Sequence, residues 1–282
     1  MNGGNLKLSR GALADTGQWR LIITVSDTGM SAYFKNLIDP DIDLVNYLSK
    51  KWEGNEENLL QLVEETVYEN PDILDDFATQ IIIYTPESLW IPEELTDEEE
   101  FDEKYFTTVF TAKKEDIFSD FGEEEVCLYA LAPGLNSFFQ RTLPGCKVMC
   151  HLTMIQRWLK DLERINLISS GGNSDRIYVN ARDRQVDLFA FRKGKFMSGS
   201  THRWKNINDI IYESLLLAKA YEMDPEETRL IVLGSHGFNE ALRDSIQEFF
   251  PMATNRKTTA LSEKYNLPFE VALAAGYNYT KL

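Results

Sequence analysis

The segment Leu21-Ile22-Ile23-Thr24-Val25-Ser26-Asp27-Thr28-Gly29-Met30-Ser31 joins two apolar runs through a short polar turn. Residues 21–25 and 30–34 are rich in β-branched and aromatic side chains, which favour strands. Asp27 and Gly29 lie between the two runs, and both residue types favour a tight turn. The segment therefore predicts a β-hairpin near the start of the fold.

The residues after this hairpin predict a mixed α/β first half. We expect helices over 41–52 and 56–69, the second ending before Pro71, and a buried strand over 80–84. Further along, the pattern predicts strands over 106–111, 115–118 and 125–131, a helix over 133–141, a short strand ending at Val148 and a helix over 153–165.

An acidic run separates these elements, with eight carboxylates in the eleven positions 93–103. Thr96-Asp97-Glu98-Glu99 fits a capping box at a helix start, where acidic side chains face the positive end of the helix dipole. A calcium loop would need a central glycine, and this run has none. We interpret the run as a capped helix start.

The second half repeats the order of the first. After the linker-like segment 169–174, we expect a three-stranded meander over 177–181, 185–191 and 195–202, and then a helix capped by Asn206. A strand over 229–233, a glycine turn, a helix to Phe250 and a last helix from Pro268 follow. This repeated order predicts a duplicated α/β protein of two lobes, residues 1–168 and 169–282, with a central cleft.

Charge and composition limit the partners. The 282 residues carry a net charge of −16, and all of it falls in residues 1–160, which hold 13 basic and 29 acidic residues against 16 of each in 161–282. Phosphate repulsion argues against nucleic acid as a partner of the first half. No apolar run approaches the ~18 residues of a membrane span. We therefore expect a cytoplasmic protein.

One basic patch interrupts the second half between positions 175 and 205. It is either a solvated sheet face, a surface paired with the acidic half, or an anion site between the lobes. Its residues are Arg176, Arg182, Arg184, Arg192, Lys193, Lys195, Arg203 and Lys205.

Other reactive residues are few. Cys146, Cys150 and His151 could supply three metal ligands, but no fourth ligand follows at zinc-site spacing, so we expect buried thiols, a histidine at a helix start and no metal. No nucleophile elbow or P-loop lysine motif occurs.

The order of the elements resembles the actin-like ATPase superfold of actin, sugar kinases and heat-shock chaperones, which is ribonuclease H-like. Across nearly its full length the chain resembles an uncharacterised bacterial domain-of-unknown-function family with that superfold. The segments that carry this resemblance are 21–31, Tyr84-Thr85-Pro86-Glu87-Ser88-Leu89-Trp90-Ile91-Pro92 and Asp187-Leu188-Phe189-Ala190-Phe191-Arg192-Lys193-Gly194-Lys195. Similar lobes occur in cytoplasmic scaffold proteins of pilus and secretion machines, where partner binding is the usual task.

The resemblance implies three nucleotide motifs. Asp27-Thr28-Gly29-Met30-Ser31 matches the first phosphate hairpin, D-x-G-x-T/S, in which the aspartate acts through magnesium-bound water. At the second hairpin, Val179-Asn180-Ala181-Arg182-Asp183-Arg184 has Asn180 where the relatives carry aspartate, and it has no glycine. Gly234-Ser235-His236-Gly237 resembles the adenosine motif and equally fits a plain strand-to-helix turn.

Three hypotheses follow. The leading one is a non-catalytic actin-like protein that binds a protein partner, has a degenerate nucleotide site and needs no cofactor, because a neutral amide cannot replace a carboxylate in holding hydrated magnesium. The alternative is an ATP-binding protein or phosphotransferase using magnesium. Its candidate residues are Asp27 for magnesium, with Thr28, Gly29 and Ser31 in the first phosphate hairpin. In the second hairpin they are Asn180 and either Arg182 or Arg184, an arginine there replacing lost backbone contacts to phosphate. Gly234, Ser235, His236 and Gly237 would lie around adenosine. The third, compatible with the first, is an acidic module in which residues 93–103 recruit a basic partner.

Overall fold

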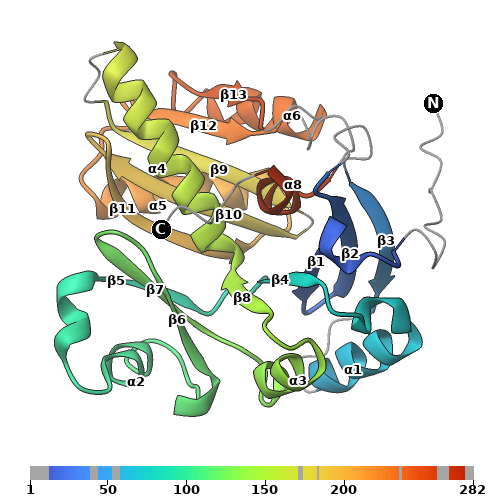
Figure 1. Ribbon diagram of the computed structural model, residues 1–282. Coiled ribbons are helices and arrows are strands. Elements are labelled where there is room, and N and C mark those ends of the chain that lie inside the picture. Colours follow the sequence, from blue (N-terminus) through green and yellow to red (C-terminus); the bar gives the residue numbers. More distant parts are fainter. Residues whose placement is uncertain are drawn as a thin grey trace.

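A computed structural model describes residues 13–38, 44–52, 58–170, 174–182, 184–234, 237–258 and 267–276. Within these ranges the chain forms two five-stranded sheets with the same internal order (Figure 1). In each sheet three antiparallel strands are followed by two parallel ones. The duplicated two-lobe α/β fold that the sequence predicted is confirmed.

The first sheet has the order β3-β2-β1-β4-β8, and the second has the order β11-β10-β9-β12-β13. The strands of the first are β1 (Trp19–Ser26), β2 (Gly29–Asn36), β3 (Val45–Lys51), β4 (Ala78–Ile83) and β8 (Lys147–Cys150). Those of the second are β9 (Arg176–Arg182), β10 (Gln185–Arg192), β11 (Lys195–Arg203), β12 (Arg229–Leu233) and β13 (Thr254–Arg256).

A third, smaller sheet is inserted in the first lobe between β4 and β8. It consists of β5 (Ser88–Pro92), β7 (Glu125–Ala130) and β6 (Ile117–Phe121), all antiparallel, with the short helix α2 (Phe101–Phe106) packed on it. The edge strand β5 lies beside β11 of the second lobe.

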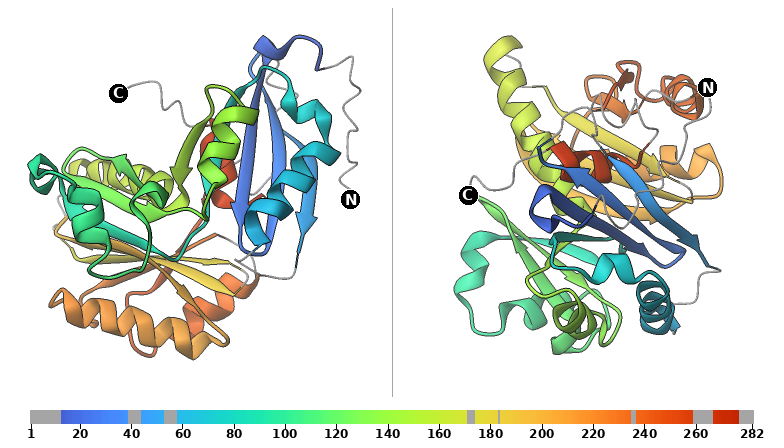
Figure 2. Two further views of the ribbon diagram at one scale, coloured as in Figure 1. Left: turned by 90° about the horizontal axis from the view of Figure 1, so that it is seen from below. Right: turned by 45° about the vertical axis from the view of Figure 1, so that its right-hand side comes forward.

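The helices cover the sheets and join the lobes. They are α1 (Leu59–Glu69), α3 (Leu135–Thr142), α4 (His151–Ser170), α5 (Ile207–Ala220), α6 (Gly237–Ile246) and α8 (Phe269–Gly276). Figure 2 shows α5 and α6 on the outer face of the second sheet and α8 at the junction of the two large sheets. The helix α8 contacts both α4 and β1, so a C-terminal element ties the lobes together.

Three local expectations were wrong. Residues 45–51 form β3 rather than part of a helix over 41–52, because they pair with β2 along its free edge. Residues 106–111 are not a strand, since α2 ends at Phe106 and turns follow. Thr96 caps no helix: its hydroxyl donates to the Glu93 carbonyl inside a 3-10 turn (Glu93–Asp97), and α2 begins after Glu100.

Other local expectations are confirmed. Asn206 caps α5, and the Asp209 side chain completes a reciprocal capping box. The meander β9-β10-β11 has the predicted turns. The predicted division of the chain at residues 168 and 169 stays a prediction, and α4 runs through that position.

Candidate functional site

The first predicted phosphate hairpin is held by contacts within its own lobe. The Trp52 indole Nε1 donates to the Asp27 carbonyl at 3.0 Å, and the backbone N–H of Trp52 donates to the Thr28 carbonyl. Ser31 and Ser49 hydroxyls lie 3.2 Å apart across β2 and β3. The Asp27 carboxylate meets Arg203 of the second lobe at 3.4 Å, so this turn also reaches across to β11.

Gly29 is required by close packing of the backbone. A Cβ atom at this position would lie 2.7 Å from the Lys50 carbonyl oxygen of β3. That approach is shorter than any ordinary carbon–oxygen contact, so the glycine of the D-x-G-x-S match has a structural reason in β2–β3 pairing.

The second predicted hairpin joins β9 to β10 through a strained turn. Arg184 has φ of 58°, in the left-handed region that favours glycine. The Trp204 indole stabilises the turn by donating to the carbonyls of Arg182 and Gln185 at 3.1 and 3.0 Å. A tryptophan thus supports a turn that has no glycine.

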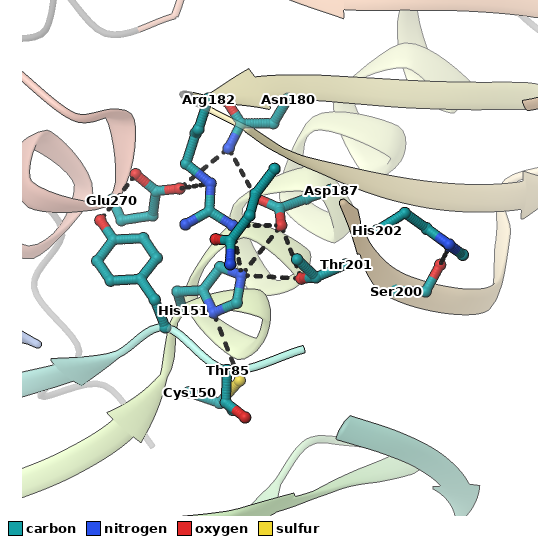
Figure 3. Close-up of polar contacts among 12 residues, drawn as sticks. Thr85, Cys150, His151, Asn180, Arg182, Asp187, Ser200, Thr201, His202 and Glu270 are labelled. Atoms are coloured by element: carbon teal, nitrogen blue, oxygen red, sulfur yellow. Dashed lines mark hydrogen bonds and ion pairs between the residues drawn. The ribbon is translucent and has the colours of Figure 1, made fainter. Parts of the chain in front are cut away.

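Arg182 and Asn180 of this hairpin enter a buried polar network between the lobes (Figure 3). Its centre is the Asp187 carboxylate, which has no exposed surface. Oδ1 accepts from Arg182 Nη2 at 2.6 Å and from the Thr201 hydroxyl at 2.8 Å, while Oδ2 accepts from Asn180 Nδ2 at 3.0 Å. We call the set Asp187, His151, Arg182, Asn180, Thr201 and Glu270 the interlobe network.

His151 brings the first lobe into the network. It begins α4 directly after β8, and its Nε2 lies 3.0 Å from Asp187 Oδ1. Its Nδ1 lies 3.2 Å from the Ile83 carbonyl of β4. Both ring nitrogens thus face an acceptor, to which a doubly protonated, cationic ring can donate. Arg182 Nη2, a donor, also lies 3.1 Å from Nε2 and opposes the positive charge on the ring.

The surrounding charges favour the protonated form of His151 and the ionised form of Asp187. Burial alone would lower the pKa of His151, but Asp187 raises it to about 9. Burial alone would raise the pKa of Asp187, but Arg182 and then His151 lower it well below its ordinary value. The pair is therefore an ion pair near neutral pH.

Glu270 of α8 closes the network from the C-terminal side. Its Oε1 accepts from Asn180 Nδ2 at 3.0 Å, and its Oε2 accepts from the Tyr84 hydroxyl at 3.2 Å. The Arg182 guanidinium lies 4.5 Å from the centre of the Tyr84 ring, within cation–π range. Arg182 is thus flanked by Asp187, Glu270 and an aromatic face.

A second buried layer lies beneath His151. The Asp120 carboxylate accepts the backbone N–H of Cys150 at 2.8 Å, and burial, with Cys150 as the next cause, raises the pKa of Asp120 to about 7. The Cys127 thiol hydrogen-bonds Cys150, and this contact together with His151 lowers the pKa of Cys150 despite burial. All three cysteines are free and buried, as predicted.

The predicted adenosine turn is described only in part. Gly234 directly follows β12 with φ of 97°, and a Cβ there would lie 2.5 Å from the Asn239 side chain. Gly237 begins α6, while Ser235 and His236 lie outside the described residues. The positive φ and the close Asn239 side chain therefore explain a glycine at position 234 without any bound nucleotide.

Of the predicted site residues that the structure describes, only Asn180 and Arg182 meet in one network. The Asp27–Ser31 turn and Gly234 make separate contacts, and Arg184 lies in the turn itself. The sequence reasoning missed Asp187, Thr201 and Glu270 and placed His151 only at a helix start. Asp187 is the one charged residue in the otherwise apolar run 186–191 of β10, and this is the one local signal that could have singled it out.

Two structural tests apply to the described part of the chain. No cluster of three or more histidine, cysteine, aspartate or glutamate side chains there could hold a metal ion. Nor does any helix in these ranges have the length and apolar character to cross a bilayer.

Comparisons with known proteins agree with the fold. Residues 10–252 match the family model described as "Protein of unknown function (DUF3822)". A Bacteroides thetaiotaomicron protein with actin-like ATPase fold and unknown function is similar at 18% identity and a TM-score of 0.75, over 93% of this chain and 97% of that one. No curated protein sequence matches.

Two further structures are less similar. The PilM-PilN type IV pilus biogenesis complex matches at 9% identity and a TM-score of 0.50, over 90% of this chain and 96% of that one. The ethanolamine utilization protein EutJ from Carboxydothermus hydrogenoformans matches at 9% identity and a TM-score of 0.45, over 90% and 89%. At 18% identity, the likeness to the Bacteroides protein shows the actin-like fold alone.

Proposed function

The chain belongs to the protein family DUF3822, whose function is unknown, and from that premise we propose that it is a non-catalytic actin-like protein that binds a protein partner. The observation that carries the proposal is the interlobe network. Asp187 and Glu270 both accept from Asn180 of the second hairpin, and both also face the guanidinium of Arg182. The guanidinium of Arg182 therefore already balances the carboxylates that a bound metal cation would need as ligands.

The residues present do not fit a hydrated magnesium ion and a triphosphate at this hairpin. A divalent cation near Asp187 would be repelled by Arg182 and by the charged His151. Arg182 has 17% of its side-chain surface exposed, and its charge is balanced by Asp187 at 2.6 Å and Glu270 at 3.9 Å, so a phosphate at this place would be repelled by two carboxylates. The hairpin also lacks the glycine that would let its backbone N–H groups approach an anion.

A thermal-unfolding titration with ATP and ADP, each with and without magnesium, tests this part of the proposal. We expect no nucleotide-dependent shift. A ligand at 100 times its dissociation constant would add about 2.7 kcal/mol to the free energy of unfolding, which is easily measured.

The alternative ATP-binding function has its own signature in the same experiment. It requires a magnesium-dependent shift that Asp27→Ala abolishes. Arg203→Gln is the matched control, because it breaks the same ion pair but keeps the carboxylate. A shift lost in Asp27→Ala and kept in Arg203→Gln would contradict our proposal.

The partner-binding part rests on an acidic groove between the inserted sheet and β11. The groove has a volume of about 570 Å³, and six carboxylates line it together with Trp90, Lys195, Phe196 and Met197. The six are Glu93, Glu94, Asp97, Glu123, Glu124 and Glu125. Lys160 and Arg164 neutralise Glu123, and Lys160 also pairs with Glu125.

A basic segment of a protein partner fits this groove best. Among the described residues no ion pair engages Glu93, Glu94 or Asp97, and all three are exposed. The ring of Trp90 packs edge-on against Phe196 at 4.9 Å and gives the groove an aromatic wall for the apolar stem of a lysine or arginine. The PilM structure, which is of a complex with PilN, supports a partner-binding role for a chain of this fold.

Co-purification from cells of the native host tests this surface. We expect the variant Glu93→Gln, Glu94→Gln, Asp97→Asn to lose partners that the unaltered chain retains at low salt. The control variant Glu226→Gln, Glu227→Gln, Glu248→Gln removes as much charge from exposed positions of the second lobe and should keep them. If both variants captured the same partners equally well, the acidic groove would not be the partner-binding surface.

A further inference from the structure

A second cavity lies at the end of the second sheet that is remote from the interlobe network. The strand β9 begins at Arg176, which faces the cavity, and ends at Arg182 in the network. The cavity has a volume of about 700 Å³. Its lining is Arg176, Arg229, Ile231, Gln247 and the segment Pro251, Met252, Ala253, Thr254, Asn255 and Arg256.

The strand register places three arginines on one face of this sheet. Arg229 of β12 lies opposite Arg176 of β9, and Ile231 lies opposite Thr254 of β13. Residues opposite one another, and residues two apart on a strand, share a face. Arg176, Arg229 and Arg256 therefore project from three adjacent parallel strands toward the same side.

Negative charge on this face comes from Glu163 of α4. Its buried carboxylate accepts from Arg176 and from the Tyr178 hydroxyl. Burial and then Glu163 raise the pKa of Tyr178, while Arg176 and Arg256 both oppose the rise, so both guanidinium groups lie near this phenol. In the described part of the chain no carboxylate forms an ion pair with Arg229 or Arg256. Three guanidinium groups thus face one carboxylate.

The rest of the lining suits a small molecule with a polar end. Ile231 and the 40%-exposed Met252 supply apolar surface. Thr254 and Gln247 add polar side chains to the lining. The volume lies in the range of about 300–1,000 Å³ that small-molecule pockets have.

We propose that this cavity, the arginine pocket, binds the phosphate group of a small molecule. The guanidinium fork matches phosphate oxygens with two parallel hydrogen bonds, and Arg229 and Arg256 have that capacity open. The guanidinium of Arg176, which pairs with Glu163, lies at the back of the pocket. Inorganic phosphate and a phosphomonoester present the same oxygens, and the ester can also use the apolar surface of Ile231 and Met252. The inference is independent of the proposed function, since it uses no residue of the cleft or the acidic groove.

Isothermal titration calorimetry on the full chain tests the pocket with phenyl phosphate and with inorganic phosphate. Phenol and sodium chloride, at matched ionic strength, serve as reference ligands. We expect saturable binding of the phosphates and none of the reference ligands. Tighter binding of phenyl phosphate identifies an ester as the natural class, and equal binding identifies free phosphate.

Variants distinguish the pocket from general attraction to positive charge. Arg229→Gln and Arg256→Gln should each weaken phosphate binding about tenfold or more, because each removes charge-assisted hydrogen bonds. Arg141→Gln, on α3 of the first lobe, removes an exposed arginine elsewhere and should leave binding unchanged. Thermal unfolding confirms that each variant is folded. No saturable phosphate binding, or equal binding in all three variants, would overturn the proposal.

Discussion

His151 and Asp187 come from opposite lobes, and Nε2 of the histidine lies 3.0 Å from Oδ1 of the aspartate with neither side chain exposed. Because the histidine begins the helix that runs from the first lobe onto the second, this contact fixes α4 to both sheets. The pair thus joins the lobes through charge as well as through apolar packing, and its strength depends on the protonation of His151.

His151→Gln should change the pH dependence of stability. The pKa of His151 is about 9 in the folded protein against an ordinary value of 6.5, so its contribution is complete below about pH 6.5 and is lost as pH rises through 9. At 1.36 kcal/mol per pKa unit the contribution is about 3 kcal/mol. Because the Cys150 thiol beside His151 has a lowered pKa and opposes this slope, urea unfolding between pH 6 and 10 is measured in a Cys150→Ser background. There the slope should be present with His151 and with the control His202→Gln, but absent with His151→Gln.

Asp120→Asn should change the pH dependence of stability at lower pH than His151→Gln does. Since the folded protein holds the Asp120 proton up to about pH 7, while the unfolded chain releases it near 3.8, stability falls as pH rises from about 4 to 7. The asparagine cannot ionise and can still accept the Cys150 N–H. The variant should therefore gain stability relative to the unaltered chain between pH 4 and pH 8, by about 4 kcal/mol on the same scale. Parallel curves over this range would show that Asp120 ionises normally.

Arg182→Met should destabilise the fold strongly. It removes the cation that faces both Asp187 and Glu270, and an uncompensated buried charge costs about 3–5 kcal/mol. The double variant Arg182→Met, Asp187→Asn removes both charges and should recover part of that loss. Denaturant unfolding of the two singles and the double gives the coupling free energy, and additive losses would mean that the two side chains act independently.

Gly29→Ala should destabilise the first lobe without any change of charge. The new Cβ would meet the Lys50 carbonyl at 2.7 Å, and the strands must shift apart at a cost of about 1–3 kcal/mol. Gly17→Ala is the matched control, because the nearest atom to its Cβ would be a side-chain oxygen of Asp15 at 3.4 Å. A thermal midpoint for Gly29→Ala equal to that of the control would mean that β3 adjusts freely.

Local sequence patterns predicted most of the fold. The hairpin β1–β2, the meander β9-β10-β11 and the cap at Asn206 depend on neighbouring residues, and each is confirmed. Residues 45–51 were missed because their apolar spacing also fits a helix. What decides their conformation is pairing with β2, together with the packing of Tyr47 on Phe34 at 5.3 Å, and these are tertiary interactions.

The candidate site could be predicted only where its residues belong to one motif. Asn180 and Arg182 stand out because they depart from a known hairpin pattern. Glu270 lies 90 residues from Asn180, and His151 lies 36 residues from Asp187. No periodicity connects residues so far apart, because the contact between them is created by the meeting of two lobes.

The position of α8 also bears on how the molecule assembles during synthesis. A chain leaves the ribosome from its N-terminus, so every strand of both sheets emerges before the helix that carries Glu270. Until then Asn180 and Tyr84 lack their shared carboxylate partner, and α4 and β1 lack the helix that packs between them. The contacts that α8 makes with Asn180, Tyr84, α4 and β1 can therefore form only after both sheets have been synthesised, and they complete a joint that His151 and Asp187 can begin.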